Sequence, residues 1–384
     1  MATLALTPPA SSRRYADVLP VLAAAGVLYS AFWPIVTSDI ALSYVPWLDH
    51  VAADGPLKAL GAPFGDYTPP YYYLLAIASP FVGAVPGEML VKLVSLACTL
   101  MLAASVWRLA RALRIDRPEL VAAATLLLPG VALNTALMGQ CDALSTAPLV
   151  MAVAAVVERR TARMFLWCGV AAAIKAQAAF CAPFFLAMAI RHRAPWREWL
   201  LAPAATLAMF APALLLGWPL SDLLTIYTRQ AGFFEELSRN APNIWALVQL
   251  LPLGLPLTGL ANAAALGASA GYAAHFGTRP LTDRATVAAA ALAPLIVVGL
   301  LPRMHERYFY AADVLVFVWA VASRRAGDWI TAGLVNLGSL LGILAYGTGV
   351  EELAMLGALP MLLATWRLAR PILTRAANDN PVVA

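Results

Sequence analysis

Charged residues are scarce in this chain. Aspartate, glutamate, lysine and arginine make up only 12% of its 384 residues, whereas 61% are hydrophobic. A soluble globular domain carries about 25% charged residues, so the composition excludes an ordinary soluble protein. Runs of about 18 or more residues with almost no charge recur along the chain, which is typical of membrane-spanning helices. The sequence therefore predicts an all-α fold, a polytopic bundle of transmembrane helices.

Cysteine is also rare, and its spacing does not indicate metal binding. No CxxC occurs, and the four cysteines lie in or beside apolar runs: Cys98, Cys141, Cys168 and Cys181. Small core residues are the better interpretation of such isolated thiols. No DxD sequence occurs either. A divalent metal is therefore possible, if Asp39, Asp66 and Asp142 meet in space, but it is not indicated, and we predict no cofactor.

Most of the 26 lysines and arginines fall in short clusters between apolar runs. Because these clusters are scattered rather than gathered in one patch, we expect no binding to nucleic acid. Basic residues in short loops mark the cytoplasmic side of a membrane protein. The clusters are Arg13/Arg14, Arg108/Arg111/Arg114/Arg117, Arg159/Arg160/Arg163, Arg191/Arg193/Arg197, Arg279/Arg284, Arg324/Arg325 and Arg367/Arg370/Arg375.

If every basic cluster is cytoplasmic, the apolar segments between them must cross the membrane and return. We expect about 11–12 membrane helices, including short or re-entrant ones. The expected spans are 15–37, 88–107, 119–134, 142–157, 199–217, 257–276, 284–301, 308–323, 328–346 and 351–366. The stretch 164–190 is too short for two full spans, so we predict a hairpin of short or tilted helices with Lys175 near its outer tip. Non-helical backbone at that depth is tolerated only against protein or a water-filled cavity.

The expected topology places both termini in the cytoplasm and the loops 38–87, 135–141, 218–256, 302–307 and 347–350 outside. Residues 71–85, interrupted by Pro80, are expected to form an interfacial helix with tyrosines at headgroup level. The aromatic and polar residues of loop 218–256 are candidates for an acceptor groove. We expect a single transmembrane domain over residues 1–370 and a disordered cytoplasmic tail over 371–384.

Polar residues of the first two outer loops are candidates for a site. Asp39 directly follows the first span, where a carboxylate is costly unless it faces water or a partner; the alternative is a polar helix end beside Ser38. Asp66 and Tyr67 belong to "GDYTPPYYY", where a structural role for Asp66 is as good an interpretation as a functional one. Gln140 and Asp142 lie where a helix restarts, so Asp142 has helix capping as its alternative.

Two further segments carry charge into apolar surroundings. Lys175 has no acidic neighbour in "AAIKAQAAF" and needs an anion; we expect a phosphate, the alternative being a snorkelling lysine. In "LPRMHERYFY", Arg303 and Arg307 would share one face of a helix. Two guanidiniums suit a doubly charged phosphate, with His305 beside them and Glu306 orienting one of them. The alternative for this segment is an interfacial anchor.

The segments "SDI", "GDYTPPYYYLLA", "MGQCDA", "AAIKAQAAFCAPF" and "LPRMHERYFY", in this order, resemble the GT-C class of membrane glycosyltransferases. The nearest groups are bacterial GPI-mannosyltransferase-II-like proteins and the dolichyl-phosphate-glucose-dependent glucosyltransferases. The resemblance covers residues 38 to 310, and "MHERYF" is its most specific element. It implies a GT-C-like fold and Asp39 as catalytic base. It also implies an active-site wall containing Asp66, Pro69 and Pro70, and places Lys175, His305 and Glu306 near the donor phosphate.

Nucleotide sugars are cytosolic, so a transferase with its polar residues outside needs a donor already carried across the membrane. We therefore expect an inverting transferase of the inner (plasma) membrane. It would move a hexose of mannose or glucose type from a polyprenyl-phosphate donor to a lipid- or glycan-linked acceptor on the extracytoplasmic face. Asp39 would be the general base. The expected substrate-binding and phosphate-binding residues are Lys175, Arg303, His305, Glu306, Arg307, Asp66, Tyr67, Gln140 and Asp142.

Two alternatives remain open at this point. A transporter or flippase for an anionic lipid or sugar would also need charges in the membrane, but at its midplane and reachable from both sides. A structural subunit of an envelope-polysaccharide complex would leave Asp39 dispensable.

Overall fold

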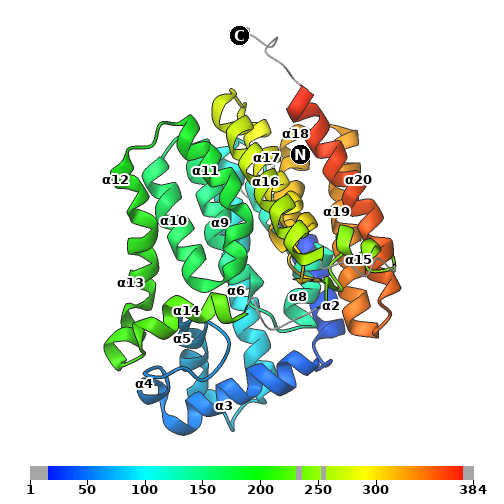
Figure 1. The fold of residues 1–384 in the computed structure, drawn as a ribbon. Coiled ribbons are helices and arrows are strands. Elements are labelled where there is room, and N and C mark those ends of the chain that lie inside the picture. Colours follow the sequence, from blue (N-terminus) through cyan, green and yellow to red (C-terminus); the bar gives the residue numbers. More distant parts are fainter. Residues whose placement is uncertain (1–15, 231–235, 252–256, 375–384) are drawn as a thin grey trace, which may run out of the picture.

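The computed structural model describes residues 16–230, 236–251 and 257–374. Within them the chain is a bundle of helices, and the only strands form one pair of two-residue segments, β1 (Ser238–Arg239) and β2 (Met304–His305) (Figure 1). The predicted all-α class is confirmed. The expected tail at 371–384 is wrong for its first four residues, because helix α20 (Glu352–Thr374) continues through them. Residues 1–15 and 375–384 lie outside the described residues.

Among the described residues, five helices are long and apolar enough to cross a membrane. They are α6 (Gly87–Ala112), α12 with α13 (Trp196–Leu216), α17 (Asp283–Leu300), α19 (Ala326–Thr348) and α20. A sixth span results if α7 (Pro118–Thr125) and α8 (Pro129–Ala136), bent by 53° at their junction, cross together. The chain is therefore a multi-pass membrane protein.

Shorter apolar helices fill most of the remaining expected spans. They are α2 (Val18–Phe32), α9 (Asp142–Val157), α10 (Thr161–Ile174), the segment Ala176–Arg191 that contains α11 (Ala182–Arg191), and α18 (Tyr310–Ser323). Helix α16 (Leu257–Thr278) has the length of a span, but its alanines, glycines and polar residues make it less apolar than the five long helices.

The helices end where local chemistry requires it. Gly217 and Gly349 follow α13 and α19 in the left-handed conformation, which glycine adopts without steric cost. The side chain of Thr282 accepts a hydrogen bond from the N–H of Ala285 and so caps the N-terminus of α17. Glycine residues after helix ends and a threonine cap before a helix start thus define where these helices stop and the chain turns.

The basic turns gather at one end of the bundle. There Arg108 pairs with Glu158, Arg324 pairs with Asp116, and Arg117 pairs with Asp17. The helices of the first loop, α3 (Val45–Asp54), α4 (Pro56–Ala59) and α5 (Pro69–Ala78), lie at the opposite end (Figure 1). This separation agrees with the expected alternation of basic and non-basic loops. Which end faces the cytoplasm stays a prediction.

The hairpin predicted around Lys175 is two short helices with a break between them. Helix α10 ends at Ile174, and Lys175 itself has an extended backbone with φ −149° and ψ 145°. A 3-10 segment, η3 (Ala176–Cys181), leads into α11. The non-helical backbone is covered by protein, because the hydroxyl groups of Thr68 and Tyr227 donate to the carbonyls of Ile174 and Ala172 at 2.7 Å each.

The expectation for the tyrosines of the first loop is wrong in part. Tyr71 and Tyr72 of α5 are 1% and 0% exposed, so their side chains contact protein and not lipid headgroups. Their rings pack against Tyr44, Trp47 and Trp218 instead. Aromatic contacts therefore hold α5 against α3 and the rest of the bundle end.

Helices α10 and α13 approach so closely that only glycine fits at their contact. A Cβ on Gly169 would lie 2.8 Å from the Cα of Ala202, and the hydroxyl of Thr206 donates to the carbonyl of Gly169 at 2.9 Å. Small residues at such contacts are the usual means by which membrane helices pack.

We expect Gly169→Ala to lower the stability of the purified protein by about 1–3 kcal/mol, because the added methyl group meets the backbone of α13. Thermal unfolding in detergent measures the effect. The matched control is Gly267→Ala on the exposed side of α16, where nothing lies near an added methyl group. Equal stability of the two variants would contradict the prediction.

Candidate functional site

A polar cavity of about 320 Å³ is lined in part by the first loop, which also carries α3 to α5. It lies beside a short π-helix, η1 (Ile40–Tyr44), and the segment around β2. Six of the predicted site residues line it: Asp39, Asp66, Tyr67, His305, Glu306 and Arg307. The first three come from one loop and the last three from another, more than two hundred residues later, so the fold brings them together.

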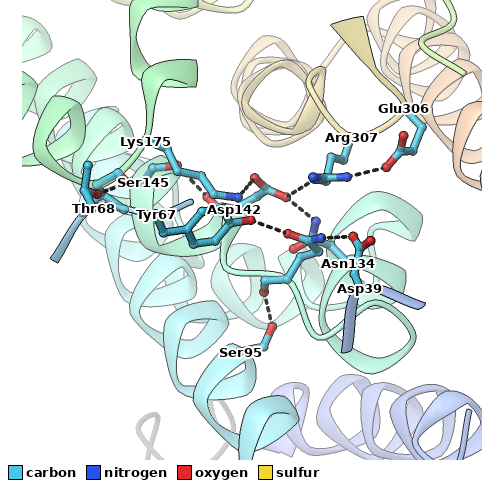
Figure 2. Close-up of polar contacts among 12 residues, drawn as sticks. Asp39, Tyr67, Thr68, Ser95, Asn134, Asp142, Ser145, Lys175, Glu306 and Arg307 are labelled. Carbon is cyan, nitrogen blue, oxygen red and sulfur yellow. Dashed lines mark hydrogen bonds and ion pairs between the residues drawn. The ribbon is translucent and has the colours of Figure 1, made fainter. Parts of the chain in front are cut away.

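Asp39 is held by an amide and not by a cation. Gln140 donates from Nε2 to Asp39 Oδ2 at 2.6 Å, and its own Oε1 accepts hydrogen bonds from Tyr44 at 2.5 Å and Tyr67 at 3.2 Å. The backbone carbonyl of Gln140 accepts a hydrogen bond from Ser95. No salt bridge joins Asp39 to a lysine or arginine of the described chain. Its carboxylate is thus oriented without being neutralised (Figure 2).

Four charged side chains, two of which line the polar cavity, form a continuous chain (Figure 2). Lys175 Nζ lies 2.7 Å from Asp142 Oδ1, Arg307 Nε lies 3.6 Å from Asp142 Oδ2, and Arg307 NH1 lies 2.6 Å from Glu306 Oε1. Their side chains are between 1% and 13% exposed. Asn134 also donates to Asp142 at 2.6 Å. Two cations and two anions balance, which buried charges require.

The ion pair with Asp142 removes the reason for expecting that Lys175 binds a phosphate. Lys175 does have an anionic partner, Asp142, although 33 positions separate them in the sequence. It also lies over the ring of Tyr67, with Nζ 4.8 Å from the centroid. The uncompensated charge that suggested a phosphate partner is therefore absent, and a phosphate role for Lys175 stays a prediction. Asp142 opens helix α9, but its contacts exceed those of a helix cap.

The expectation that Arg303 and Arg307 share a helical face is wrong. Arg303 has a left-handed backbone with φ 63°, and the next two residues form β2, parallel to β1. Since no helix runs through the segment, the two guanidiniums diverge. Arg307 lines the polar cavity with Asp39, whereas Arg303 lines a neighbouring one.

Three cavities adjoin one another. The second, of about 310 Å³, shares Gln177, His305 and Tyr308 with the polar cavity. Arg303 lines it, and none of its described lining residues is acidic. The third, of about 600 Å³, shares Ala176 and Tyr227 with the second, and its lining is largely apolar and comes mainly from α10, α11 and α13. A cavity with both carboxylates and arginines, a cavity with Arg303, and a largely apolar cavity bordered by Lys175 thus adjoin in this order.

Burial and neighbouring charges shift the pKa values of the loop between α17 and α18. Burial lowers the pKa of His305 below its ordinary value, the contact with Glu306 opposes this, and Arg307 and Arg239 add to the lowering. Burial alone would raise the pKa of Glu306, but Arg307 and His305 bring it below the ordinary range. At neutral pH the imidazole is therefore uncharged and the carboxyl group is ionised.

No group of three or more histidine, cysteine, aspartate or glutamate residues in the described chain is arranged to hold a metal ion. Asp39, Asp66 and Asp142 do not form such a group. The four thiols are free, and three of them are buried, which agrees with core packing.

Several lining residues were not singled out by the sequence analysis. Arg239 and Asn240 bring loop 218–256 to the polar cavity, as its expected role requires, although residues 231–235 of that loop lie outside the described residues. Tyr44 and Trp47 lie three positions apart after Asp39, a spacing that places them on one helical face. Nothing in the sequence around Tyr346 of α19 or Gln177 indicates that they belong to the site, because only the packing of the helices brings them to the cavity.

No family model matches the chain, and no curated protein matches it.

We expect Lys175→Met to destabilise the protein by about 3–5 kcal/mol, because it leaves Asp142 buried with one cation lost. The double variant Lys175→Met/Asp142→Asn should recover part of that loss, since both charges of the pair are gone. Thermal unfolding of the four proteins of this cycle measures the coupling. Additive effects would show that the pair does not act as a unit.

We expect the stability of the protein to fall as the pH drops below the ordinary pKa of histidine, 6.5. The folded state holds the pKa of His305 lower, so the unfolded chain binds the proton more readily and acid favours unfolding. Replacement of His305 by Asn should reduce the fall. Melting temperatures between pH 7.5 and pH 5 are the measurement, and equal slopes for both proteins would refute the assignment.

Proposed function

We propose that this chain is a membrane glycosyltransferase that uses a lipid-phosphate sugar as its donor. The observation that carries the proposal is the order of the three cavities. A polyprenyl-phosphate sugar is a polar ring, an anionic phosphate and a long apolar chain in series. The cavity with Asp39, the cavity with Arg303 and the apolar cavity between α10, α11 and α13 match those three parts in the same order.

The charges support this placement of the donor. The cavity with Arg303 has no acidic lining among the described residues, and His305 also lines it. An anionic phosphate is therefore better accommodated beside Arg303, with neutral His305 as a neighbour. The carboxylates of Asp39 and Asp66 line the next cavity, where a neutral sugar and an acceptor hydroxyl meet no such repulsion.

The chemistry follows from this arrangement. Asp39, oriented by Gln140, takes the proton from an acceptor hydroxyl. The acceptor oxygen then attacks the anomeric carbon from the face opposite the phosphate. The bond from that carbon to the phosphate oxygen breaks, and the lipid phosphate leaves with the bonding electrons. Arg303 stabilises the charge that develops on the leaving group. One carboxylate suffices, and the configuration at the anomeric carbon inverts.

The sugar is a hexose of mannose or glucose type, and the acceptor is a lipid- or glycan-linked hydroxyl, in keeping with the GT-C resemblance. The basic turns lie at the end of the bundle opposite the first-loop helices, and residues of that loop line the polar cavity. By the rule for basic loops, this supports a site on the extracytoplasmic face, and we propose the plasma membrane with both termini in the cytoplasm. A transporter is supported less well, because the polar cavities collect towards one end of the bundle.

We expect Asp39→Asn to lower the release of lipid phosphate from a synthetic polyprenyl-phospho-hexose at least about 100-fold, because the general base is lost. The assay uses purified protein with the donor and a lipid-linked sugar acceptor, and product is measured by mass spectrometry. Asp49→Asn is the matched control, since Asp49 is exposed and does not line the cavity. Equal turnover by wild type and Asp39→Asn would exclude the role of Asp39, and transport of intact donor across a vesicle membrane would favour a flippase.

A further inference from the structure

Helix α6 carries a buried polar face that the proposed chemistry does not use. Lys92, Ser95 and Thr99 are 1%, 1% and 0% exposed. Their spacing of three and four positions places them on one side of the helix. A lysine buried within a membrane helix is costly, so packing alone does not account for it.

Lys92 binds the end of the first helix. Its Nζ lies 2.7 Å from the carbonyl oxygen of Trp33, 2.6 Å from that of Ile35 and 3.3 Å from that of Phe32. The last carbonyls of a helix have no partners within the helix, and they carry the negative end of its dipole. The three donors of the ammonium group therefore match three acceptors at the end of α2. Asp39 follows Ile35 by four residues.

Ser95, one turn further along α6, contacts Gln140, the residue whose side chain holds Asp39. Its hydroxyl donates to the backbone carbonyl of Gln140. The side chain of Gln140 in turn holds the carboxylate of Asp39. One face of α6 thus fixes both the chain that carries Asp39 and the amide that orients it. Thr99 instead contacts Thr135 of α8, at 2.6 Å between the two hydroxyl oxygens.

We propose that Lys92 is a positioning residue for Asp39, acting through the carbonyls at the end of α2, with Ser95 fixing the orienting amide. The effect of Lys92 on catalysis rests on the proposed transferase function. Its anchoring of the segment that carries Asp39 does not. Without Lys92, the three carbonyls lose the ammonium group, although the carbonyl of Phe32 still accepts from the N–H of Ile35 at 3.2 Å. The segment 33–44 then gains freedom. Asp39 then meets the acceptor hydroxyl in a productive geometry less often, while the donor phosphate, bound elsewhere, is unaffected.

The experiment compares Lys92→Met with Lys92→Arg and Thr99→Val in purified, membrane-reconstituted protein. Lys92→Met should lower kcat about 100-fold, as misplacement of a catalytic group does, and leave the donor KM within about twofold. Lys92→Arg keeps a cationic donor and should recover a large part of kcat. Thr99→Val removes a buried polar contact of the same helix and should leave kcat close to wild type. A loss of kcat equal in Lys92→Met and Thr99→Val, or a rise in KM alone, would overturn the proposal.

Hydrogen–deuterium exchange tests the structural part without turnover. Lys92→Met should speed exchange in peptides covering 33–44 and leave the peptides of α17 and α18 unchanged. If wild type shows no transferase activity, this measurement still decides the role of Lys92. If Lys92→Met does not fold, Ser95→Ala replaces it in both measurements and should show the same pattern at smaller size. Unchanged exchange at 33–44 in the folded variant would refute the role.

Discussion

The chain of charges from Lys175 through Asp142 and Arg307 to Glu306 is the interaction on which the candidate site depends. It joins the break after α10, the start of α9 and the loop before α18, which are far apart in the sequence. Any one of these charges alone would be too costly to bury in a membrane protein, so the four are stable only together. Because their partners are each other, they hold these three segments together, and two of them, Arg307 and Glu306, also line the polar cavity.

This division separates residues that build the site from residues available to a substrate. Asp39 and Arg303 line the first two cavities, whereas Lys175 lines the apolar cavity and is paired with Asp142. The tyrosines of the first loop divide in the same way. Tyr67 lines the polar cavity, whereas Tyr71 and Tyr72 are buried and support the structure around it. A polar residue in an apolar chain can therefore mark a functional site while taking no direct part in the chemistry.

The sequence predicted the helices well, because apolar runs and basic turns are local signals. The break at Lys175 was also predictable, since the run 164–190 is too short for two spans. The gathering of Asp39, Asp66, Tyr67 and the segment around His305 at one cavity agreed with expectation. The partner of Lys175 was not predictable, because the pairing depends on how α9 and α10 meet. The geometry of Arg303 was missed because its left-handed backbone leaves no trace in hydrophobic periodicity, and the role of Lys92 was missed because the carbonyls that it binds are present in every sequence.

Tyr227 of α14 (Leu220–Gln230) contributes to two adjoining cavities while its hydroxyl is tied to the carbonyl of Ala172. Because this one side chain borders both cavities, a substitution at Tyr227 would reshape both spaces at once. If the chain is the proposed transferase, α14 is the element through which the thickness of the accepted lipid changes.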